Sequence, residues 1–526
     1  QHRQLNKKGA TLELAHRNSQ ASVPFFVSSR GYGFLWNNPA IGSVNFATNV
    51  TEWHAKRTVK LDYFITAGDT PAEIEAQYSL ATGRTPMMPE YGLGYWQCKL
   101  RYRTQEELLN VAREHKRRGL PLDAIVIDFF HWTLQGDFRF EPRDWPDPDA
   151  MVKELHDMGV ETVVSVWPTV DDRSRNYPFM AEHGYLVASD HGCSLNSTWM
   201  GNTTYFDATH PDAQKFVWEQ CKENYYQKGI RCFWLDEAEP EYGNYDFDNY
   251  RYYAGPALQC SNVYPVGYAK GFYEGLKEAG EENVMSLIRC AWAGSQKYAV
   301  LTWSGDVYSS FRSMREQLQA GLSMGMAGIP WWTSDIGGFI GGQPVDPAFR
   351  ELLMRWFAWG CFCPVFRMHG ERSPWYEREV EYIDNVRQRA HALHQQHQHD
   401  THGAGIAEFI ADAAVVHDVG DDGFACVVGG GKTRQLYGDV RHSERGDDLH
   451  DRTEEQLGHH CREGDVPQFL EAVLDTVHHT GFVEGDVHRL HTGDEGQEAD
   501  AHAHPQLHND QHRQDGTHIK HDLDRD

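Results

Sequence analysis

The feature that most constrains the fold is a series of apolar segments that alternate with helix-like segments between residues 91 and 368. Segments such as 124–127 and 162–166 are apolar at almost every position, which is typical of parallel strands buried on both faces. Helical windows separate them, and one of these begins with a capping-box pattern at Thr104 and Glu107. The predicted strands are 91–97, 124–130, 161–167, 231–236, 285–290, 298–303, 328–334 and 363–368.

Eight such units over about 290 residues fit a (β/α)8 TIM barrel of the α/β class, whose chemistry lies at the carboxyl ends of the strands. A doubly wound nucleotide-binding fold is the competing arrangement. However, no Gly-x-Gly-x-x-Gly follows the first strand, and the chain has no phosphate-loop lysine motif. Residues 1–85 alternate short apolar strands with turns, which predicts a partial N-terminal β-sandwich before a barrel at 86–385.

The remaining residues, 386–526, differ in composition from the rest of the chain. All sixteen tryptophans lie at or before Trp375, whereas twenty of the thirty histidines lie at or after His391. We interpret this His- and Asp-rich tail as a frameshifted or disordered segment, because it has few of the apolar periodic windows that a packed core needs. A metal-binding tail is the alternative, but the histidine spacing is irregular and paired cysteines are absent from it.

The charge of the chain limits its partners. Forty-nine lysines and arginines against seventy-six acidic residues give a net charge of −27, which argues against nucleic-acid binding through a basic surface. No run of about 18 apolar residues occurs, so we expect no membrane-spanning helix. The ten scattered cysteines are expected to be buried thiols. Because residue 1 is Gln, we expect a truncated or processed N-terminus, and a cytoplasmic and a secreted location both stay open.

Polar residues follow most of the predicted barrel strands. Because parallel strands end at the same face of a barrel, we expect these side chains to converge on one pocket. Tryptophans near the same strand ends offer apolar ring faces to sugars. The polar residues are Asp128, Asp236, Arg289, Asp306, Asp335, Arg367 and His369, and the tryptophans are Trp96, Trp132, Trp167, Trp234, Trp303, Trp331 and Trp332.

Several carboxylates with arginine, histidine and tryptophan, without an obvious metal-ligand cluster, are typical of a site that handles sugars. Glycoside cleavage needs one ionised carboxyl group and one protonated carboxyl group with unequal pKa values. Asp236 and Asp306 are the candidates, although Glu237, Glu239 and Glu241 crowd the first of them. Strand alternation places Asp236 and Glu237 on opposite faces.

Several ordered motifs resemble segments of glycoside hydrolase family 31, the family of retaining α-glucosidases and α-xylosidases. The resemblance covers about residues 20–380. It includes the segment Ile125-Val-Ile-Asp-Phe-Phe-His-Trp132. The other motifs are Trp234-Leu-Asp-Glu-Ala-Glu239, Arg289-Cys-Ala-Trp-Ala-Gly-Ser-Gln-Lys-Tyr298 with Trp303-Ser-Gly-Asp306, Ser334-Asp-Ile-Gly-Gly-Phe339 and Arg367-Met-His-Gly370.

The resemblance implies that Asp236 is the catalytic nucleophile and Asp306 the acid/base of a double displacement that retains configuration. Such a reaction predicts carboxyl groups about 5 to 5.5 Å apart. We expect no cofactor and no metal. Together with the tryptophans at the strand ends, the implied substrate-binding residues are Asp128, Trp234, Arg289, Trp303, Asp335 and His369.

The expected substrate is an α-linked oligosaccharide or glycoside. The motif at Asp128 resembles the α-xylosidase branch, and the ring of Phe129 could crowd the hydroxymethyl group of a hexose. An α-xylosidase (EC 3.2.1.177) that releases terminal non-reducing α-xylose is therefore favoured over an α-glucosidase or α-galactosidase. The alternative of another class is an inactive sugar-binding barrel from a truncated gene, and the presence of both Asp236 and Asp306 argues against it.

Overall fold

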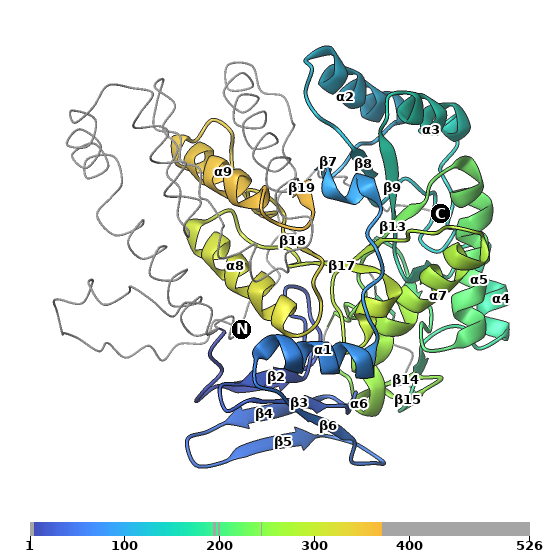
Figure 1. Ribbon diagram of the computed structural model, residues 1–526. Coiled ribbons are helices and arrows are strands. Elements are labelled where there is room, and N and C mark those ends of the chain that lie inside the picture. The colour runs from blue at the N-terminus through green and yellow to red at the C-terminus, as the bar shows by residue number, and fades with distance from the viewer. Residues whose placement is uncertain (1–4, 193–195, 198–199, 244, 371–526) are drawn as a thin grey trace, which may run out of the picture. The chain divides into compact units, whose positions relative to one another are not determined.

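Eight parallel strands form the central sheet of the computed structural model, in which residues 5–192, 196–197, 200–243 and 245–370 are described (Figure 1). Their order is β18, β17, β16, β13, β9, β8, β7 and β19. A parallel bridge between Ile336 and Met368 joins the two ends of this order, so the sheet is a nearly closed barrel. The strands are β7 (Tyr95–Gln97), β8 (Ala124–Ile127), β9 (Glu161–Val166), β13 (Cys232–Leu235), β16 (Ser286–Ile288), β17 (Val300–Trp303), β18 (Trp332–Thr333) and β19 (Phe366–Met368).

The TIM barrel predicted from the sequence is therefore confirmed, with each strand shorter than its apolar segment. The described residues lie in the first of two compact units of the chain, residues 1–482. The predicted tail at 386–526 and the predicted boundary near residue 385 lie outside the described residues.

Helices connect the barrel strands and bury one side against them. At the start of α2, Oγ1 of Thr104 accepts a hydrogen bond from the backbone N–H of Glu107 (3.2 Å), as the capping pattern predicts. The carboxylate of Glu107 accepts from the backbone of Arg103 (2.8 Å), one residue before the cap. The helices after the first are α2 (Gln105–Arg117), α3 (Pro148–Asp157), α4 (Tyr177–Glu182), α5 (Pro211–Asn224), α6 (Ala257–Cys260), α7 (Tyr264–Glu278), α8 (Phe311–Met326) and α9 (Pro347–Gly360).

Two antiparallel three-stranded sheets precede the barrel, as the predicted partial β-sandwich requires. Aromatic side chains pack between them: the ring of Trp53 lies 5.3 Å from that of Phe34 and 5.8 Å from that of Trp36. The first sheet contains β1 (Thr11–Leu14), β4 (Gly42–Phe46) and β5 (Thr51–Ala55). The second contains β2 (Phe25–Ser28), β3 (Tyr32–Trp36) and β6 (Tyr63–Ala67).

Helix α1 (Pro71–Thr82) packs on the second sheet and was not predicted. Tyr78 stacks on Phe25 with ring centroids 3.8 Å apart, and Ile74 joins the same apolar cluster. Only Ile74 and Tyr78 of the helix are buried, so its hydrophobic periodicity is weak. The sequence signal that indicates this helix is at its N-terminus, where Thr70 is the N-cap and the first helical residue is proline.

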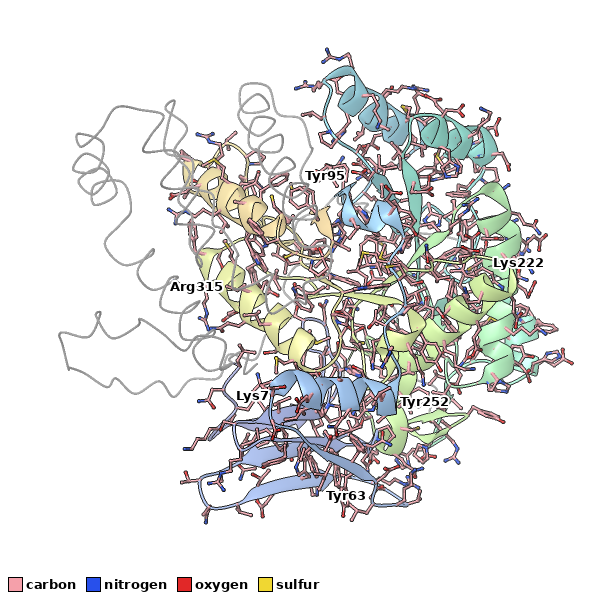
Figure 2. The ribbon with its side chains drawn as sticks, viewed as in Figure 1. Lys7, Tyr63, Tyr95, Lys222, Tyr252 and Arg315 are labelled. Carbon is pink, nitrogen blue, oxygen red and sulfur yellow. The ribbon has the colours of Figure 1, made fainter. Side chains whose placement is uncertain are left out.

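Side chains fill the interior of the barrel and the space beneath its helices (Figure 2). Two small sheets form within the connections between barrel strands. One pairs β10 (Thr169–Asp171) with β12 (Thr203–Tyr205), and the other contains β11 (Ala188–Ser189), β14 (Tyr250–Tyr252) and β15 (Gly255–Pro256). The seven cysteines in the described part of the chain are buried free thiols, as predicted. Within that part, none of the helices has the length and hydropathy needed to cross a bilayer.

Candidate active site

The residues predicted to form the site lie at or just beyond the carboxyl ends of the barrel strands, as the arrangement of parallel strands requires. They come from six different strands and the connections that follow them, so the closed sheet brings them together. They are Asp128 after β8, Asp236 after β13, Arg289 after β16, Asp306 beyond β17, Asp335 beyond β18 and His369 after β19, with Trp234 in β13 and Trp303 in β17.

The guanidinium of Arg289 joins the two aspartates predicted to be catalytic. Its Nη1 lies 3.4 Å from Oδ1 of Asp236 and 3.9 Å from Oδ2 of Asp306. These two oxygens are therefore separated by less than the sum of the two distances. Strands β13, β16 and β17 are neighbours in the barrel, which explains why residues far apart in the sequence meet here.

Two glutamates complete the surroundings of Arg289. Glu239 accepts hydrogen bonds from Nε (2.7 Å) and Nη2 (3.0 Å), and Glu241 accepts from Nη2. Four carboxyl groups thus face one buried guanidinium. Bidentate pairing is the geometry for which arginine is best suited, so Glu239 is held as an ion-pair partner.

The structure thereby separates the members of the acidic cluster after β13. Asp236 keeps the longest of the three contacts that this cluster makes with Arg289. Glu237 supplies its backbone N–H to Oδ1 of Asp236 (2.8 Å) and directs its carboxylate to the hydroxyl of Tyr205 (3.3 Å). Asp236 and Glu237 therefore have different side-chain partners, but both follow the end of β13 and Glu237 has a φ of +48°, so strand alternation does not account for the difference.

A second buried arginine, Arg367 of β19, has a different environment. It pairs with the buried carboxylate of Asp335. Its guanidinium carbon lies 5.5 Å from the ring centroid of Trp234 and 5.7 Å from that of Trp303, within the range of cation–π attraction. These two rings meet edge to face at 5.4 Å and are only 3% and 2% exposed. They form a packed wall, and their stacking on sugar stays a prediction.

Asp128 and His369 face each other beside this wall. Nε2 of His369 lies 3.8 Å from Oδ2 of Asp128, which is too long for a direct hydrogen bond. Oδ1 of Asp128 accepts from the backbone of Phe129 (2.7 Å), whereas no described residue donates a hydrogen bond to Oδ2. A buried carboxylate oxygen that receives no hydrogen bond from the protein is suited to accept one from a hydroxyl group of a ligand.

Cys98 could complete a metal-binding group with Asp128 and His369, since one ligand atom from each lies within 4.8 Å of the others. Burial raises the pKa of the Cys98 thiol well above its usual range, although the nearby charge of Arg367 opposes this. A metal requires the thiolate, and a neighbouring guanidinium repels a cation. The donor set therefore fits hydroxyl recognition better than a metal ion.

Burial raises the pKa values of both candidate catalytic aspartates. It brings the pKa of Asp236 to about 7, opposed by the charge of Arg289 and reinforced by that of Asp306. It also raises the pKa of Asp306, while Arg289 and a hydrogen bond from Asn18 lower it. Burial acts on both carboxyl groups in the same direction, and the division into an ionised Asp236 and a protonated Asp306 stays a prediction.

Aromatic side chains form a rim beside Asp128. The ring of Phe129 lies 4.9 Å from that of Trp167 and 4.9 Å from that of Phe130. The guanidinium of Arg101 covers both phenylalanines, with its carbon 5.0 Å from the Phe129 centroid. Phe129 thus stands beside the predicted sugar-binding carboxylate, where the sequence motif placed it.

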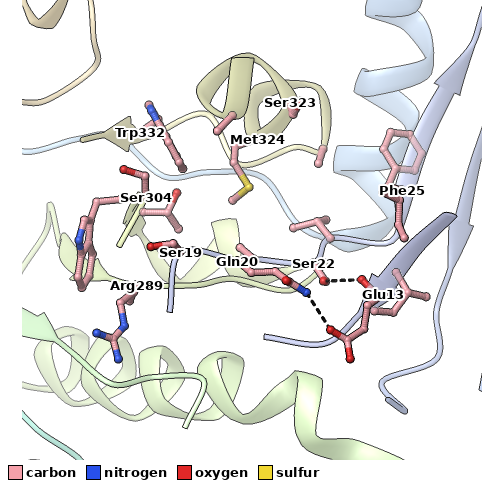
Figure 3. A pocket seen from close by; sticks show the side chains of 18 of the residues that line it. Glu13, Ser19, Gln20, Ser22, Phe25, Arg289, Ser304, Ser323, Met324 and Trp332 are labelled. Carbon is pink, nitrogen blue, oxygen red and sulfur yellow. Dashed lines mark hydrogen bonds between the residues drawn. The ribbon is translucent and has the colours of Figure 1, made fainter. Parts of the chain in front are cut away.

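A cavity of about 210 Å³ adjoins the site between α8 and the segment that connects β1 to β2. Arg289 and Ser304 line it from the barrel, and Ser323 and Met324 from α8 (Figure 3). Ser19, from the N-terminal segment, lies on its wall next to Arg289 in the same view. The N-terminal segment therefore reaches the barrel, which no local pattern in the sequence predicts.

The comparison with known families agrees with this architecture. The model of the glycosyl hydrolases family 31 TIM-barrel domain matches residues 85–397. This chain belongs to glycosyl hydrolase family 31. The family resemblance inferred from the sequence motifs is therefore confirmed. The matched residues include every barrel strand.

Relatives within family 31 include proteins named as glucosidases and as xylosidases. An uncharacterized family 31 glucosidase, ORF2, from Pseudescherichia vulneris is 62% identical over 370 residues, which are 70% of each chain. The alpha-xylosidase of Saccharolobus solfataricus is 34% identical over 393 residues, covering 72% of this chain and 51% of the relative. This chain thus spans about half the length of that curated α-xylosidase.

A solved structure shows the same fold. The GH31 alpha-xylosidase from a soil metagenome, complexed with xylose, superimposes with a TM-score of 0.73 and 56% sequence identity. The alignment covers 76% of this chain and 64% of that one.

Proposed function

We propose that this protein is a retaining α-glycosidase that releases α-xylose from the non-reducing end of its substrate. The observation that carries the proposal is the convergence of Asp236 and Asp306 on one nitrogen of Arg289, at the carboxyl ends of neighbouring barrel strands. Two carboxyl groups within one sugar-sized site are the minimum equipment for double displacement.

In the first step, a carboxylate oxygen of Asp236 attacks the anomeric carbon while the bond to the glycosidic oxygen breaks. The Asp306 carboxylic acid gives its proton to that oxygen, which leaves as an alcohol. Asp306 is then ionised and takes a proton from water, whose oxygen attacks the anomeric carbon and displaces Asp236. Two inversions give net retention, and both carboxyl groups return to their starting states.

Arg289 supports both steps through its charge. As the ester forms, Asp236 loses its negative charge while Asp306, which has given up its proton, gains one, so the number of carboxylates around Arg289 stays the same. Because Arg289 lies within 4 Å of both aspartates, its charge favours the ionised form of each when the mechanism needs it. Asp335 and Arg367 hold the wall of the sugar site, and Oδ2 of Asp128 is the proposed acceptor for a sugar hydroxyl.

The preference for xylose rests on two supports. Phe129 stands beside Asp128 and packs against Trp167, where it would meet a hexose hydroxymethyl group. In addition, the solved structure at 56% identity is that of an α-xylosidase complexed with xylose. An α-glucosidase is the second candidate, favoured by the relative named as a family 31 glucosidase at 62% identity.

The test is to compare p-nitrophenol release from the α-xyloside, the α-glucoside and the α-galactoside. We expect the highest kcat/KM on the xyloside. A higher value on either hexoside would reject the substrate but keep the mechanism. Binding of xylose without release from any of the three would instead support the inactive sugar-binding barrel.

A further inference from the structure

We propose that Asn18, at the tip of the turn between β1 and β2, is the positioning residue of the acid/base Asp306 and determines which carboxyl oxygen carries its proton. The inference rests on the proposed function, since it assigns Asn18 to the acid/base of that reaction. Asn18 is far from Asp306 in the sequence, and none of the motifs near the barrel strands includes it.

The contact between the two residues has two hydrogen bonds in opposite directions. Nδ2 of Asn18 donates to Oδ2 of Asp306 at 2.7 Å, and Oδ1 of Asn18 accepts from the backbone N–H of Asp306 at 3.1 Å. Oγ of Ser19 also donates to the carbonyl oxygen of Asp306 at 3.3 Å. An amide that is held at both ends has one orientation, so its N–H group necessarily faces the carboxyl group.

The chain around Asn18 is built to hold this position. Arg17 and Gln20 exchange two backbone hydrogen bonds, of 3.0 and 2.8 Å, which close a turn with Asn18 and Ser19 at its tip. Ser19 has a φ of +62°, in the left-handed region that such turns require. The backbone of Asn18 donates to the hydroxyl of Tyr245 at 3.2 Å, which ties the tip to the connection that follows β13.

Close approach of the two segments depends on a glycine. A Cβ atom on Gly305 would lie 2.5 Å from the backbone nitrogen of Ser19, and Gly305 has a φ of +74°. No side chain fits there without moving the turn away from Asp306. The residue immediately before the acid/base is thus shaped to receive the N-terminal segment.

The chemical consequence concerns the two oxygens of Asp306. Among the described residues, Oδ2 is the oxygen that accepts from Asn18 and lies nearest Arg289. Arg289 and Arg367 lower the pKa of Asp306, whereas Glu241, which also accepts from Nδ2 of Asn18 at 3.2 Å, raises it. A carboxyl oxygen that accepts a hydrogen bond from an amide N–H cannot also point a proton of its own toward that N–H group. The proton of the acid form therefore resides on Oδ1, which becomes the atom that protonates the leaving oxygen. The same N–H group stabilises the carboxylate that activates water in the second step.

The test is a series of two substitutions with opposite chemistry. Asn18→Ala removes the donor, and Asn18→Asp replaces it with a negative charge. We expect the pKa of Asp306 to rise by roughly 1 unit in the first variant and by more in the second, because both destabilise the carboxylate. In the pH dependence of kcat/KM, the alkaline limb should move to higher pH in the same order. Gln20→Ala is the matched control, since Gln20 is in the same turn and contacts Ala15 rather than Asp306.

Carbon-13 NMR titration of Asp306, assigned with Asp306→Asn, measures the same pKa without turnover. A pKa that rises in the order wild type, Asn18→Ala, Asn18→Asp supports the proposal even if the wild-type chain hydrolyses none of the glycosides, in which case the proposed function alone fails. An active wild type whose Asp306 pKa and alkaline limb are unchanged in both Asn18 variants, or shift equally in Gln20→Ala, overturns it. Melting temperatures of the three variants identify any shift that comes only from a loosened turn.

Discussion

Two buried arginines at the same face of the barrel differ in the number of carboxyl groups that contact them. Arg289 faces four carboxyl groups, so its cluster carries surplus negative charge if all are ionised. Arg367 pairs with Asp335 and lies against the rings of Trp234 and Trp303, and its charge also acts on Asp128 and Asp306.

This difference matches a difference in proposed role: the Arg289 cluster contains the reacting groups, and the Arg367 pair supports the wall of the sugar-binding site. In the Arg289 cluster, burial and crowding raise the pKa of Asp236 to about 7, which makes its charge costly and its neutralisation favourable. The Arg367 pair is neutral as a whole and buried completely, and it holds the wall of the site. Substitutions in the two regions should therefore change different properties.

The largest expected effect is on turnover. Replacing Asp236 or Asp306 with Ala should lower kcat on an α-xyloside by at least about 10³-fold, because each is a reacting group of the same two steps. The circular dichroism spectrum should stay that of a folded protein. Turnover within tenfold of the wild type in either variant would remove that residue from the mechanism.

The next effect is on stability in the Arg367 region. Arg367→Met removes the guanidinium that pairs with the fully buried Asp335 carboxylate, and we expect the free energy of unfolding to fall by about 3–5 kcal/mol. Urea denaturation measures it. The control is Arg312→Met, because Arg312 is 83% exposed and its pair with Glu316 should contribute less than about 1 kcal/mol. Equal losses in both variants would show that the buried pair has no special role.

In the Arg289 region, the sign of the stability change should reverse. The folded-state pKa of Asp236 lies above its ordinary value of 3.8, so the folded protein holds this proton more tightly and loses stability as pH rises from about 4 to about 7. Asp236→Asn should therefore raise the free energy of unfolding by roughly 2–4 kcal/mol at pH 8.

Below pH 3.8 that gain should vanish, since Asp236 is then protonated in both states. Unfolding curves at the two pH values measure the difference. The control is Asp144→Asn, a surface position where no such gain should occur. A loss of stability at pH 8 would contradict the description of the Arg289 cluster as overcharged.

The smallest expected effect concerns the choice of sugar. Phe129→Ala should open space beside Asp128 and raise the ratio of kcat/KM for α-glucoside to that for α-xyloside by about 10-fold. The alkaline limb of the pH profile should not move, because the substitution removes neither a charge nor a side-chain hydrogen-bonding group. Phe179→Ala, which removes an exposed ring on α4, should leave the ratio unchanged. An unchanged ratio in Phe129→Ala would assign hexose exclusion to other residues.

Much of this molecule could be predicted from the sequence because its signals are local. The barrel strands are continuous apolar segments, and the residues after them, such as Asp128 and Asp236, are read directly from the position where each segment ends. The family motifs surround these same positions. Helix α1 could not be predicted in this way, because only two of its residues are buried and its hydrophobic periodicity is therefore very weak.

The rest depends on tertiary contacts. Nothing near Asn18 in the sequence shows that its amide reaches Asp306, since the contact requires both the turn between β1 and β2 and the glycine before Asp306. The pairing of Glu239 and Glu241 with Arg289 likewise arises only when neighbouring strands align. The pKa of Asp236 follows from burial, which the sequence pattern indicates only as a tendency.

The most direct test of the two-carboxyl mechanism is the configuration of the glycosyl azide that each variant forms in the presence of sodium azide. In Asp236→Ala, azide should enter from the face that the nucleophile leaves vacant and give the β-azide. In Asp306→Ala, azide should attack the β-glycosyl enzyme and give the α-azide. Proton NMR of the two products distinguishes them. The same anomer from both variants, or the reverse assignment, would contradict the roles of Asp236 and Asp306.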